Sequence, residues 1–452
     1  MKYDIAVIGG GPGGYHAAAI AAKRGAKVVL FEQSNLGGVC LNEGCIPTKA
    51  LLYSANMLDS MREAKKYGIT VEGEIIPDYK KIVARKQKIV RKLVAGVGQK
   101  MKNTGVEVIT ATARLDGEAD GAIRITTGEE QYLATKVILA TGSASFVPPV
   151  PGLKELPYWT SREGLATKEL PASLLIIGGG VIGMEFVGIF NSMGVEVTVV
   201  EMLPKILGPM DSEISSLLQA EYEKRGVKFY LNTKVVAASP EGVTVALPDG
   251  TEELLKAEQI MVSAGRRSVV DGLGLETLGI VPDRGIPTNE YLQTSHPQVY
   301  AIGDVNGKSL LAHTAIREGE VAVKHILEGS GDPMRYDAIP GVVYTHPEIA
   351  GVGKTEDELK ASGVAYESLD LAMSYAGRFV VENEGGNGLF KMLVDKESGK
   401  ILGGHMIGNP ASELIIIIGM AITEGLTVEQ FKRHIFPHPT VGEIVHEALF
   451  EI

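Results

Sequence analysis

The sequence predicts an α/β protein in which one strand–helix–strand unit occurs twice. An apolar strand at Ile5–Ile8 runs into a glycine-rich turn, an alanine-rich helical stretch follows over residues 15–24, and a second apolar strand covers Lys27–Phe31. A related succession begins with the apolar strand Leu174–Ile177. Strands that alternate with helices are typical of parallel sheets. At 452 residues the chain is too long for a single core, so about three domains are expected.

The glycine-rich turns keep the same register in both units. Three glycines and a closing acid recur 169 residues later: Gly9, Gly11, Gly14 and Glu32 correspond to Gly178, Gly180, Gly183 and Glu201. Glycine-rich turns in unrelated α/β units are the alternative, but they have no reason to share this register. The repeat therefore predicts two sites of the same kind.

Each unit has the pattern of a Rossmann-like dinucleotide site. Gly9 permits a tight turn, Gly11 lets the backbone approach a pyrophosphate, and Gly14 allows close contact between helix and strand. The helix N-terminus faces the phosphates, and Glu32 is placed to accept hydrogen bonds from a ribose. In the second unit Glu201 would repel a 2′-phosphate, so that site is expected to prefer NAD over NADP.

The chain contains two cysteines, Cys40 and Cys45, with four residues between them. This spacing, just before an expected helix start, allows a small disulfide ring. The N-terminus does not resemble a signal peptide, which argues against a structural disulfide of a secreted protein. On spacing alone, two unconnected buried thiols or half of a metal site stay open. Beside two dinucleotide sites, however, an electron relay between thiols, a flavin and a nicotinamide is the favoured interpretation.

Composition excludes two other classes of protein. A formal net charge of −11 argues against a surface that binds nucleic acid. No apolar run reaches the roughly 18–20 residues that span a bilayer. The apolar stretch Leu414–Ile418 is expected to form a buried helix that packs against a second subunit. We therefore expect a cytoplasmic protein that binds neither nucleic acid nor membrane.

Two further apolar strands end in candidate ligand-binding residues. The strand at 137–140 ends at Thr141 and Gly142, where a tight turn is expected. The strand at 299–302 ends in Gly303 and Asp304. An acid at the C-terminal edge of a strand is placed to bind a polyol hydroxyl, although an isolated acid there is more often a cap or turn residue.

Taken together, these residues resemble the pyridine nucleotide-disulfide oxidoreductases, and most closely their dihydrolipoamide dehydrogenase branch. The most specific match is residues 38–52, which read GVCLNEGCIPTKALL. The resemblance implies FAD in the first site, NAD in the second, and no metal. It implies that the cofactor-binding residues are Gly9, Gly11, Gly14, Glu32, Lys49, Thr141, Gly142, Asp304, Gly178, Gly180, Gly183, Glu201 and Gly265, with Asp304 at the ribityl chain.

The resemblance also assigns roles around the dithiol. Cys40 would exchange with the substrate, and Cys45 would pass electrons to the flavin. Lys49 lies four residues after Cys45, one helical turn away, and is implied to sit near the flavin in an ion pair with Glu185. One departure from the family pattern is Glu43, where relatives usually carry an apolar residue. Its charge would oppose thiolate formation.

A general base is implied near the C-terminus. In residues 436–443, FPHPTVGE, His438 would be the base and Glu443 would orient it. In this family the pair reaches the dithiol of the other subunit, so the resemblance implies a homodimer with composite active sites. Phe436 occupies a position where the family usually has a second histidine.

The motifs and the resemblance together predict the domain limits. A discontinuous FAD-binding domain is expected at 1–148 and 266–335, an NAD-binding domain at 149–265, and an α+β dimerisation domain at 336–452. The predicted fold is thus α/β, with two Rossmann-like domains and a C-terminal dimerisation domain.

The implied activity is oxidation of protein-bound dihydrolipoyl groups to lipoyl disulfide, with the electrons passed to NAD+. The lipoyl group is expected on another protein, since no lipoyl-bearing domain precedes Met1. The candidates are a 2-oxo acid dehydrogenase acyltransferase and a glycine-cleavage H protein. Glutathione-type reductases prefer NADPH, which Glu201 disfavours. A flavin-bound NAD sensor is a rival of a different class, and the complete set of catalytic residues argues against it.

Overall fold

The computed structural model describes residues 2–452, which form two compact units. The first contains the described residues up to Ala50, together with Val83–Phe146 and Gly265–Arg335. The second contains Leu51–Ile82, Val147–Ala264 and Tyr336–Ile452. The second unit thus combines the regions expected to bind NAD and to form the dimer, and the division into three domains stays a prediction.

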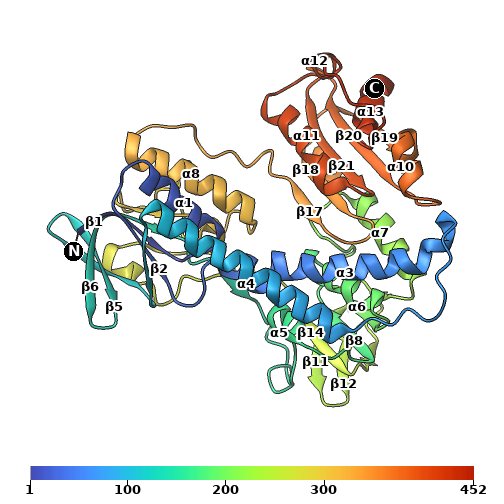
Figure 1. The fold of residues 1–452 in the computed structure, drawn as a ribbon, viewed down its shortest axis with the longest axis horizontal. Helices are drawn as coiled ribbons and strands as arrows, with labels where there is room; N and C mark the ends of the chain where they lie inside the picture. Colours follow the sequence, from blue (N-terminus) through green and yellow to red (C-terminus); the bar gives the residue numbers. More distant parts are fainter. Residues whose placement is uncertain (1) are drawn as a thin grey trace. The chain divides into compact units, whose positions relative to one another are not determined.

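A seven-stranded sheet forms the centre of the first unit (Figure 1). Its strands follow the order β3 (Glu107–Thr110), β2 (Val28–Glu32), β1 (Lys2–Ile8), β6 (Glu130–Leu139), β5 (Ala122–Thr127) and β4 (Arg114–Ala119), and β16 (Val299–Ala301) also pairs with β6. The parallel part of the sheet consists of β3, β2, β1, β16 and the C-terminal end of β6. An antiparallel extension is formed by β4, β5 and the start of β6. The parallel strands β1, β2 and β16 are largely buried, as expected when both faces of a sheet are covered.

Two helices of the first unit, α1 (Pro12–Lys23) and α8 (Ala312–Glu328), lie side by side (Figure 1). A Cβ atom added to Gly13 would lie 2.8 Å from the carbonyl oxygen of Ala315, and one added to Gly319 would lie 3.2 Å from that of Gly13. Small residues therefore let the two backbones approach closely. This contact fixes the start of α1, which follows the first glycine-rich turn.

Several short elements of the first unit surround the sheet. These are α2 (Gly38–Glu43), β7 (Ser143–Ser145), β15 (Arg266–Ser268), and the 3₁₀ helices η2 (Leu275–Leu278) and η3 (Gly303–Asn306). β7 and β15 pair in antiparallel fashion where the chain leaves and re-enters the unit. Helices α3 (Cys45–Glu63) and α4 (Tyr79–Thr104) contribute residues to both units.

The second unit repeats the strand–helix–strand arrangement around a four-stranded parallel sheet. The strand order is β10 (Lys228–Tyr230), β9 (Glu196–Val200), β8 (Ser173–Ile177) and β14 (Gln259–Val262). Helix α5 (Ser161–Ala166) precedes β8, α6 (Val181–Ser192) connects β8 to β9, and α7 (Ser212–Lys224) connects β9 to β10. The strands β11 (Lys234–Ser239), β12 (Gly242–Ala246) and β13 (Glu252–Leu255) form a separate antiparallel sheet. Asp211 caps α7 by accepting hydrogen bonds from the N–H groups of Glu213 and Ile214.

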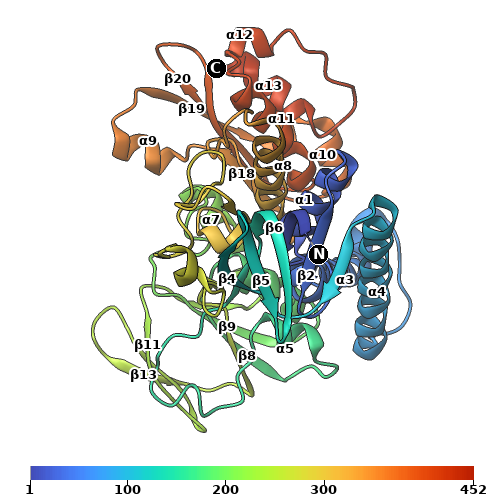
Figure 2. The ribbon, with the colours of Figure 1, turned by 90° about the vertical axis from the view of Figure 1, so that its left-hand side faces the viewer.

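The C-terminal part of the second unit is built on a five-stranded antiparallel sheet (Figures 1 and 2). Its order is β17 (Gly341–Val343), β18 (Ile349–Gly353), β21 (Ile401–Ile407), β20 (Leu389–Asp395) and β19 (Tyr366–Ala372). Helix α11 (Ala411–Thr423) contacts β18 and β21, and α13 (Glu443–Glu451) contacts β19 and β20. The shorter helices of the second unit are η1 (Ala64–Tyr67), α9 (Glu356–Ser362), η4 (Met373–Tyr375), α10 (Gly377–Glu382) and α12 (Val428–Phe431).

This architecture confirms the predicted α/β fold class with two glycine-turn units and an α+β C-terminal region. The apolar stretch expected to form a buried helix lies in α11, where Ile415 and Ile418 are buried but Ile416 is exposed. Its packing against a second subunit stays a prediction. Over residues 2–452, we find no helix with the length and apolar character needed to cross a bilayer.

Candidate active site

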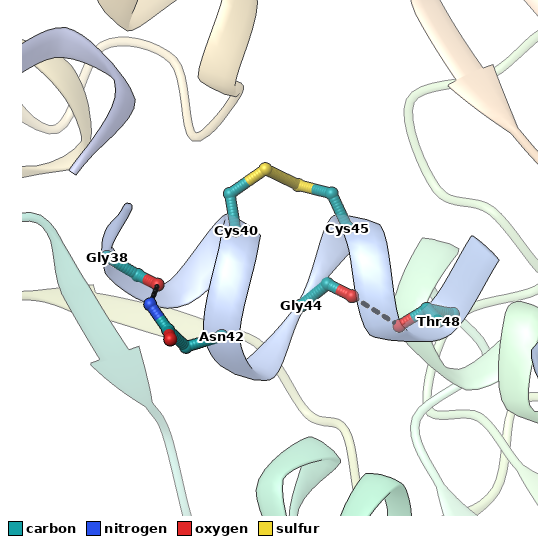
Figure 3. The surroundings of a disulfide bond; sticks show 6 residues. All are labelled: Gly38, Cys40, Asn42, Gly44, Cys45 and Thr48. Carbon is teal, nitrogen blue, oxygen red and sulfur yellow. Dashed lines mark hydrogen bonds between the residues drawn. A yellow bond between two sulfur atoms is a disulfide. The ribbon is translucent and has the colours of Figure 1, made fainter. Parts of the chain in front are cut away.

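The two cysteines form a disulfide between neighbouring helices (Figure 3). Cys40 lies in α2, Cys45 is the first residue of α3, and their Cα atoms are 4.6 Å apart. The Thr48 hydroxyl donates to the carbonyl oxygen of Gly44 at 2.6 Å, which holds the first turn of α3. The predicted ring is therefore confirmed. Within residues 2–452, no three or more histidine, cysteine, aspartate or glutamate side chains gather in a way that could hold a metal ion.

The position of Cys45 favours thiol chemistry. Helix α3 has 19 residues, and Cys45 stands at its N-terminus. The unpaired N–H groups at a helix N-terminus carry partial positive charge, which stabilises a thiolate there. Opening the disulfide would therefore leave a thiol that is predisposed to ionise.

In the first glycine-rich turn, the outer glycines Gly9 and Gly14 have no room for a side chain, whereas the central Gly11 has open space beside it. Gly9 has a φ angle of 109°, and a Cβ atom there would lie 2.2 Å from the carbonyl oxygen of Ala140. A Cβ atom at Gly14 would lie 1.9 Å from the carbonyl oxygen of Gly9. A Cβ atom at Gly11, in contrast, would meet only the Cα atom of Gly38, at 4.0 Å. The protein itself requires the outer glycines, whereas the middle position leaves space for a pyrophosphate, which fits a dinucleotide such as FAD.

The second turn repeats this pattern. A Cβ atom at Gly178 would lie 2.6 Å from the carbonyl oxygen of Ser263, and one at Gly183 would lie 2.1 Å from that of Gly178. No described atom outside the immediate neighbours lies within 4 Å of a Cβ atom placed on Gly180. Both turns thus present the same open position to a ligand.

The two closing acids are held by their own turns. Glu32 accepts hydrogen bonds from the N–H groups of Gly10 and Ser34, both at 2.8 Å. Glu201 accepts from the N–H groups of Gly179 at 2.7 Å and Leu203 at 2.8 Å. Because each carboxylate oxygen has two lone pairs, both acids retain capacity for a ribose hydroxyl. Their contacts with ribose stay predictions.

Lys205 is the first basic residue after Glu201 in the sequence, and it bonds to other groups. Its Nζ atom donates to the carbonyl oxygen of Met210 at 2.6 Å and to the hydroxyl of Ser212 at 2.9 Å. Its ammonium group is thus engaged in the turn before α7. This arrangement favours NAD over NADP at the second site.

Asp304 belongs to a polar network that the sequence did not reveal. Its Oδ2 atom accepts from the Ser143 hydroxyl at 2.5 Å. Arg266 donates from Nε to that hydroxyl at 2.7 Å and from Nη2 to the Ser143 carbonyl oxygen at 2.6 Å. Burial lowers the pKa of the Arg266 guanidinium, while the carboxylates of Asp304 and Glu43 act in the opposite direction. Ser143 and Arg266 were missed because only the β7–β15 pairing brings them to Asp304.

The remaining predicted cofactor residues of the first unit meet at the same crossing. The Thr141 hydroxyl donates to the carbonyl oxygen of Val269 at 2.8 Å, and Gly142 accepts from the Val269 N–H at 3.0 Å. The carbonyl oxygen of Gly265 accepts from the Phe146 N–H at 2.9 Å. Thr141, Gly142 and Gly265 therefore shape the backbone beside Asp304, and their contact with a cofactor stays a prediction.

A buried acid supports the Asp304 turn from behind. Glu318 of α8 is fully buried and accepts from the Gly303 N–H at 2.5 Å and from the Asn306 side-chain amide at 3.0 Å. Its position on the buried side of α8, with Ala315 and Ala322, was the available signal. An acid on an apolar helix face needs hydrogen-bond partners, and here those partners fix the turn that carries Asp304.

His438 and Glu443 come together in the second unit. The Nδ1 atom of His438 and Oε1 of Glu443 are 2.7 Å apart, and Glu443 Oε2 accepts from the Thr440 N–H at 2.8 Å. The hydrogen bond from the Thr440 N–H, followed by that from His438, lowers the pKa of Glu443. The His438 side chain is 81% exposed. Because the Glu443 carboxylate is hydrogen-bonded to Nδ1, Nε2 is the atom of His438 that can accept a proton, and the ring that carries it is accessible.

Glu185 is buried in α6 and accepts a hydrogen bond from the Tyr344 N–H at 3.2 Å. Lys49 lies in α3, in the part of the chain that belongs to the first unit, whereas Glu185 belongs to the second. Their pairing stays a prediction. The same holds for the meeting of the disulfide with His438, since these residues also belong to different units.

Family models match nearly the whole chain. A model described as pyridine nucleotide-disulphide oxidoreductase covers residues 3–319. A second model, the dimerisation domain of the same group, covers residues 339–449. The glycine turns, the disulfide and the Asp304 turn lie within the first match, and the His438–Glu443 pair lies within the second.

Curated relatives align over the full length. The chain is 38% identical to a dihydrolipoyl dehydrogenase of Chlorobaculum tepidum, with 100% of this chain and 97% of the relative covered. It is 37% identical to one from Bacillus subtilis, with 99% and 97% covered, and 40% identical to one from Thermus scotoductus, with 99% and 96% covered.

Solved structures agree in fold. LpdA from Mycobacterium tuberculosis superimposes with a TM-score of 0.90 at 27% identity, covering 99% of both chains. The HOCl-induced flavoprotein disulfide reductase RclA from Escherichia coli, solved as a Cu(II) complex, gives 0.87 at 26% identity, covering 100% of both chains. A redox disulfide next to a glycine-turn unit, a second such unit, and matches that span the chain lead to one conclusion: this chain belongs to the pyridine nucleotide-disulphide oxidoreductase family.

Proposed function

We propose that this protein is a dihydrolipoyl dehydrogenase, which oxidises dihydrolipoyl groups to lipoyl disulfide and reduces NAD+. The observation that carries this proposal is the Cys40–Cys45 disulfide at the N-terminus of α3, in a chain aligned end to end with dihydrolipoyl dehydrogenases. A redox disulfide at a helix N-terminus is suited to exchange with a substrate dithiol.

The open glycine positions fit the two cofactors. Gly11 and Glu32 would hold FAD, with Asp304 on its ribityl chain, and Gly180 and Glu201 would hold NAD. A bound flavin supplies two-electron exchange between thiols and nicotinamides. The chain's own contribution is to bind and orient FAD and NAD and to hold the dithiol beside the flavin.

The dithiol step balances without any other reactant. A substrate thiolate attacks Sγ of Cys40, the Cys40–Cys45 bond breaks, and Cys45 leaves as a thiolate. The second substrate thiol, once deprotonated, attacks the mixed disulfide at the substrate sulfur and displaces Cys40. The substrate loses two electrons and closes its ring, and the enzyme disulfide gains them.

His438 is the base in this step. The Glu443 carboxylate fixes the Nδ1–H tautomer, so Nε2 can take the thiol proton. We infer a homodimer in which the partner subunit's His438 serves each dithiol. The match to the dimerisation domain and the exposure of the His438 ring support this composite site.

The lipoyl group would be carried by another protein. A 2-oxo acid dehydrogenase acyltransferase and a glycine-cleavage H protein both present the required swinging dithiol. We place the protein in the cytoplasm, where thiols are kept reduced and a dithiol relay can cycle. Glu201 disfavours the rival assignment to an NADPH-dependent glutathione-type reductase.

Thiol trapping tests the proposed function directly. The anaerobic holoenzyme is treated with one equivalent of dihydrolipoamide without NAD+, quenched with an alkylating agent, and mapped by mass spectrometry. We expect alkylation at Cys40 and Cys45 with one lipoamide disulfide formed per pair. An unreacted disulfide, in protein that the stronger reductant dithiothreitol does open, would contradict the substrate assignment.

A further inference from the structure

Glu43 places a carboxylate inside the redox ring. The ring runs from Cys40 to Cys45, and Glu43 is the last residue of α2. Gly44 alone separates it from Cys45, and its side chain is half-buried. Because Cys45 begins α3, Glu43 stands where the partial positive charge of the helix N-terminus also acts.

The ring is held firmly against the first glycine-rich turn. The N–H group of Gly37 donates to the carbonyl oxygen of Gly10 at 2.8 Å, and a Cβ atom at Gly38 would lie 2.7 Å from Gly11 Cα. The Asn42 side-chain amide donates to the carbonyl oxygen of Gly38 at 2.9 Å (Figure 3). It also donates to the carbonyl oxygen of Leu36 at 3.1 Å. Helix α2, whose last residue is Glu43, is thus held beside the first glycine-rich turn.

Arg266 is the cation that Glu43 shares with the flavin site. Ser143 fixes the guanidinium through two hydrogen bonds, and Asp304 accepts from the same Ser143 hydroxyl. Arg266 is half-buried, and the negative charges of Asp304 and Glu43 both favour its protonated form. One positive charge therefore lies within reach of a carboxylate in the disulfide ring and of another at the predicted ribityl position.

We propose that Glu43 is a positioning residue for the dithiol step. Its negative charge destabilises the thiolate that forms when the disulfide opens, and the positive charge of Arg266 weakens this effect. The substrate dithiol gives two electrons to the Cys40–Cys45 bond, the bond breaks, and uptake of one proton yields one thiol and one thiolate. The helix N-terminus favours that thiolate and Glu43 disfavours it. A dithiol whose thiolate is less stabilised is a stronger reductant, which suits electron transfer toward NAD+.

This inference rests on the proposed dithiol relay, but its test needs neither dihydrolipoamide nor NAD+. Failure of turnover with dihydrolipoamide would leave the ionisation and the potential of the dithiol measurable. Conversely, an enzyme that turns over normally can still show that Glu43 has no influence. The two outcomes are therefore distinguishable.

The first measurement is the pH dependence of thiol alkylation. Reduced holoenzyme is treated with iodoacetamide across a pH series, and labelling at Cys40 and Cys45 is quantified by mass spectrometry. We expect Glu43→Gln to lower the midpoint of alkylation by about one pH unit, since a neighbouring like charge is removed. Glu43→Asp should stay close to the parent protein because it keeps the charge.

A matched control removes the same charge from the far end of the same helix. Glu63 is the last residue of α3, several helical turns after Cys45 in the sequence, and it is half exposed. Glu63→Gln should leave the midpoint unchanged. Equal midpoints for Glu43→Gln and Glu63→Gln, or a shift to higher pH in Glu43→Gln, would overturn the proposal.

The second measurement is the potential of the Cys40–Cys45 couple in dithiothreitol redox buffers. A tenfold gain in thiolate stability predicts a potential more positive by about 30 mV in Glu43→Gln. Removing the guanidinium with Arg266→Gln should enlarge the effect of Glu43→Gln, because the positive charge that offsets the carboxylate is then absent. The same effect in both backgrounds would overturn the role given to Arg266.

Discussion

His438 Nδ1 lies 2.7 Å from the Glu443 carboxylate, and the same carboxylate is anchored by the Thr440 N–H. The imidazole is thereby held by a group that is itself fixed to the backbone. Such an arrangement sets the tautomer of a base without restricting the ring atom that takes the proton. It also makes Glu443 testable separately from His438.

Glu443→Gln should slow the dithiol step. The amide no longer stabilises the protonated imidazole, so we expect kcat/KM for dihydrolipoamide to fall by roughly a hundredfold or more. The measurement is steady-state NADH formation. Glu451→Gln, which removes an exposed acid from the same helix α13, should behave like the parent protein. Equal rates in the two variants would contradict the orienting role.

The glycine turns predict a clear split between folding and binding. At Gly11 and Gly180 the backbone φ angles are −69° and −73°, and a Cβ atom meets no close neighbour. Gly11→Ala should therefore fold but lose flavin, and Gly180→Ala should keep its flavin and raise the KM for NAD+. Gly14→Ala, with its 1.9 Å clash, should fail to fold. Flavin absorbance and thermal unfolding check all three.

Unchanged flavin content in Gly11→Ala would place the pyrophosphate elsewhere. An unchanged KM for NAD+ in Gly180→Ala would do the same for the second site. These variants thus test the two cofactor positions independently of the dithiol.

A buried ion cluster should stabilise the second unit. The Lys391 ammonium lies 3.5 Å from Asp211 and 2.7 Å from Glu213, and the side chains of Lys391 and Asp211 are both 2% exposed. Lys391→Met leaves a buried carboxylate without this cation, and we expect a loss of about 3–5 kcal/mol in the free energy of unfolding. Urea unfolding checks this value. The control is Lys396→Met, which changes an exposed lysine on the same hairpin and should have little effect on stability. A loss in Lys391→Met as small as that in the control would argue against a stabilising cluster.

The same cluster gives a pH prediction through Glu356. The hydrogen bond from Lys360, followed by those from Tyr366 and Lys391, lowers the pKa of Glu356 from 4.5 to about 2, although burial opposes this. A lowered carboxylate pKa stabilises the folded state above the unfolded value and loses that contribution as the pH falls through the folded value. The stability difference between the parent protein and Glu356→Gln should therefore be constant above pH 4.5 and shrink toward pH 2. A difference that grows on acidification would have the wrong sign.

Local patterns made much of the fold and site predictable. The glycine turns require particular residues because their Cβ atoms would meet backbone oxygens, so the turn is encoded where it occurs. The spacing of Cys40 and Cys45 allows a disulfide, and the two dinucleotide-type units favoured that interpretation over separate thiols or a metal site. The resemblance located His438 and Glu443, since they belong to one short segment.

Contacts between distant segments were not predictable in the same way. Arg266 and Ser143 reach Asp304 only after β7 pairs with β15, and neither residue belongs to a spaced motif. Lys205 stands near Glu201 in the sequence, yet its ammonium group bonds to the turn before α7. Lys391 gains its partners from α7 and its N-cap residue, from α9 and from β19. Tertiary placement, which no local pattern contains, decides these roles.

The measurement that tests the central claim most directly is anaerobic steady-state reduction of NAD+ by dihydrolipoamide on the purified flavoprotein, with NADP+ in parallel. We expect rapid turnover with NAD+ and at least roughly tenfold lower kcat/KM with NADP+, equivalent to about 1.4 kcal/mol. Cys45→Ser should abolish both reactions. Negligible turnover with NAD+ from a flavin-loaded dimer with an intact disulfide would contradict the assignment as a dihydrolipoyl dehydrogenase.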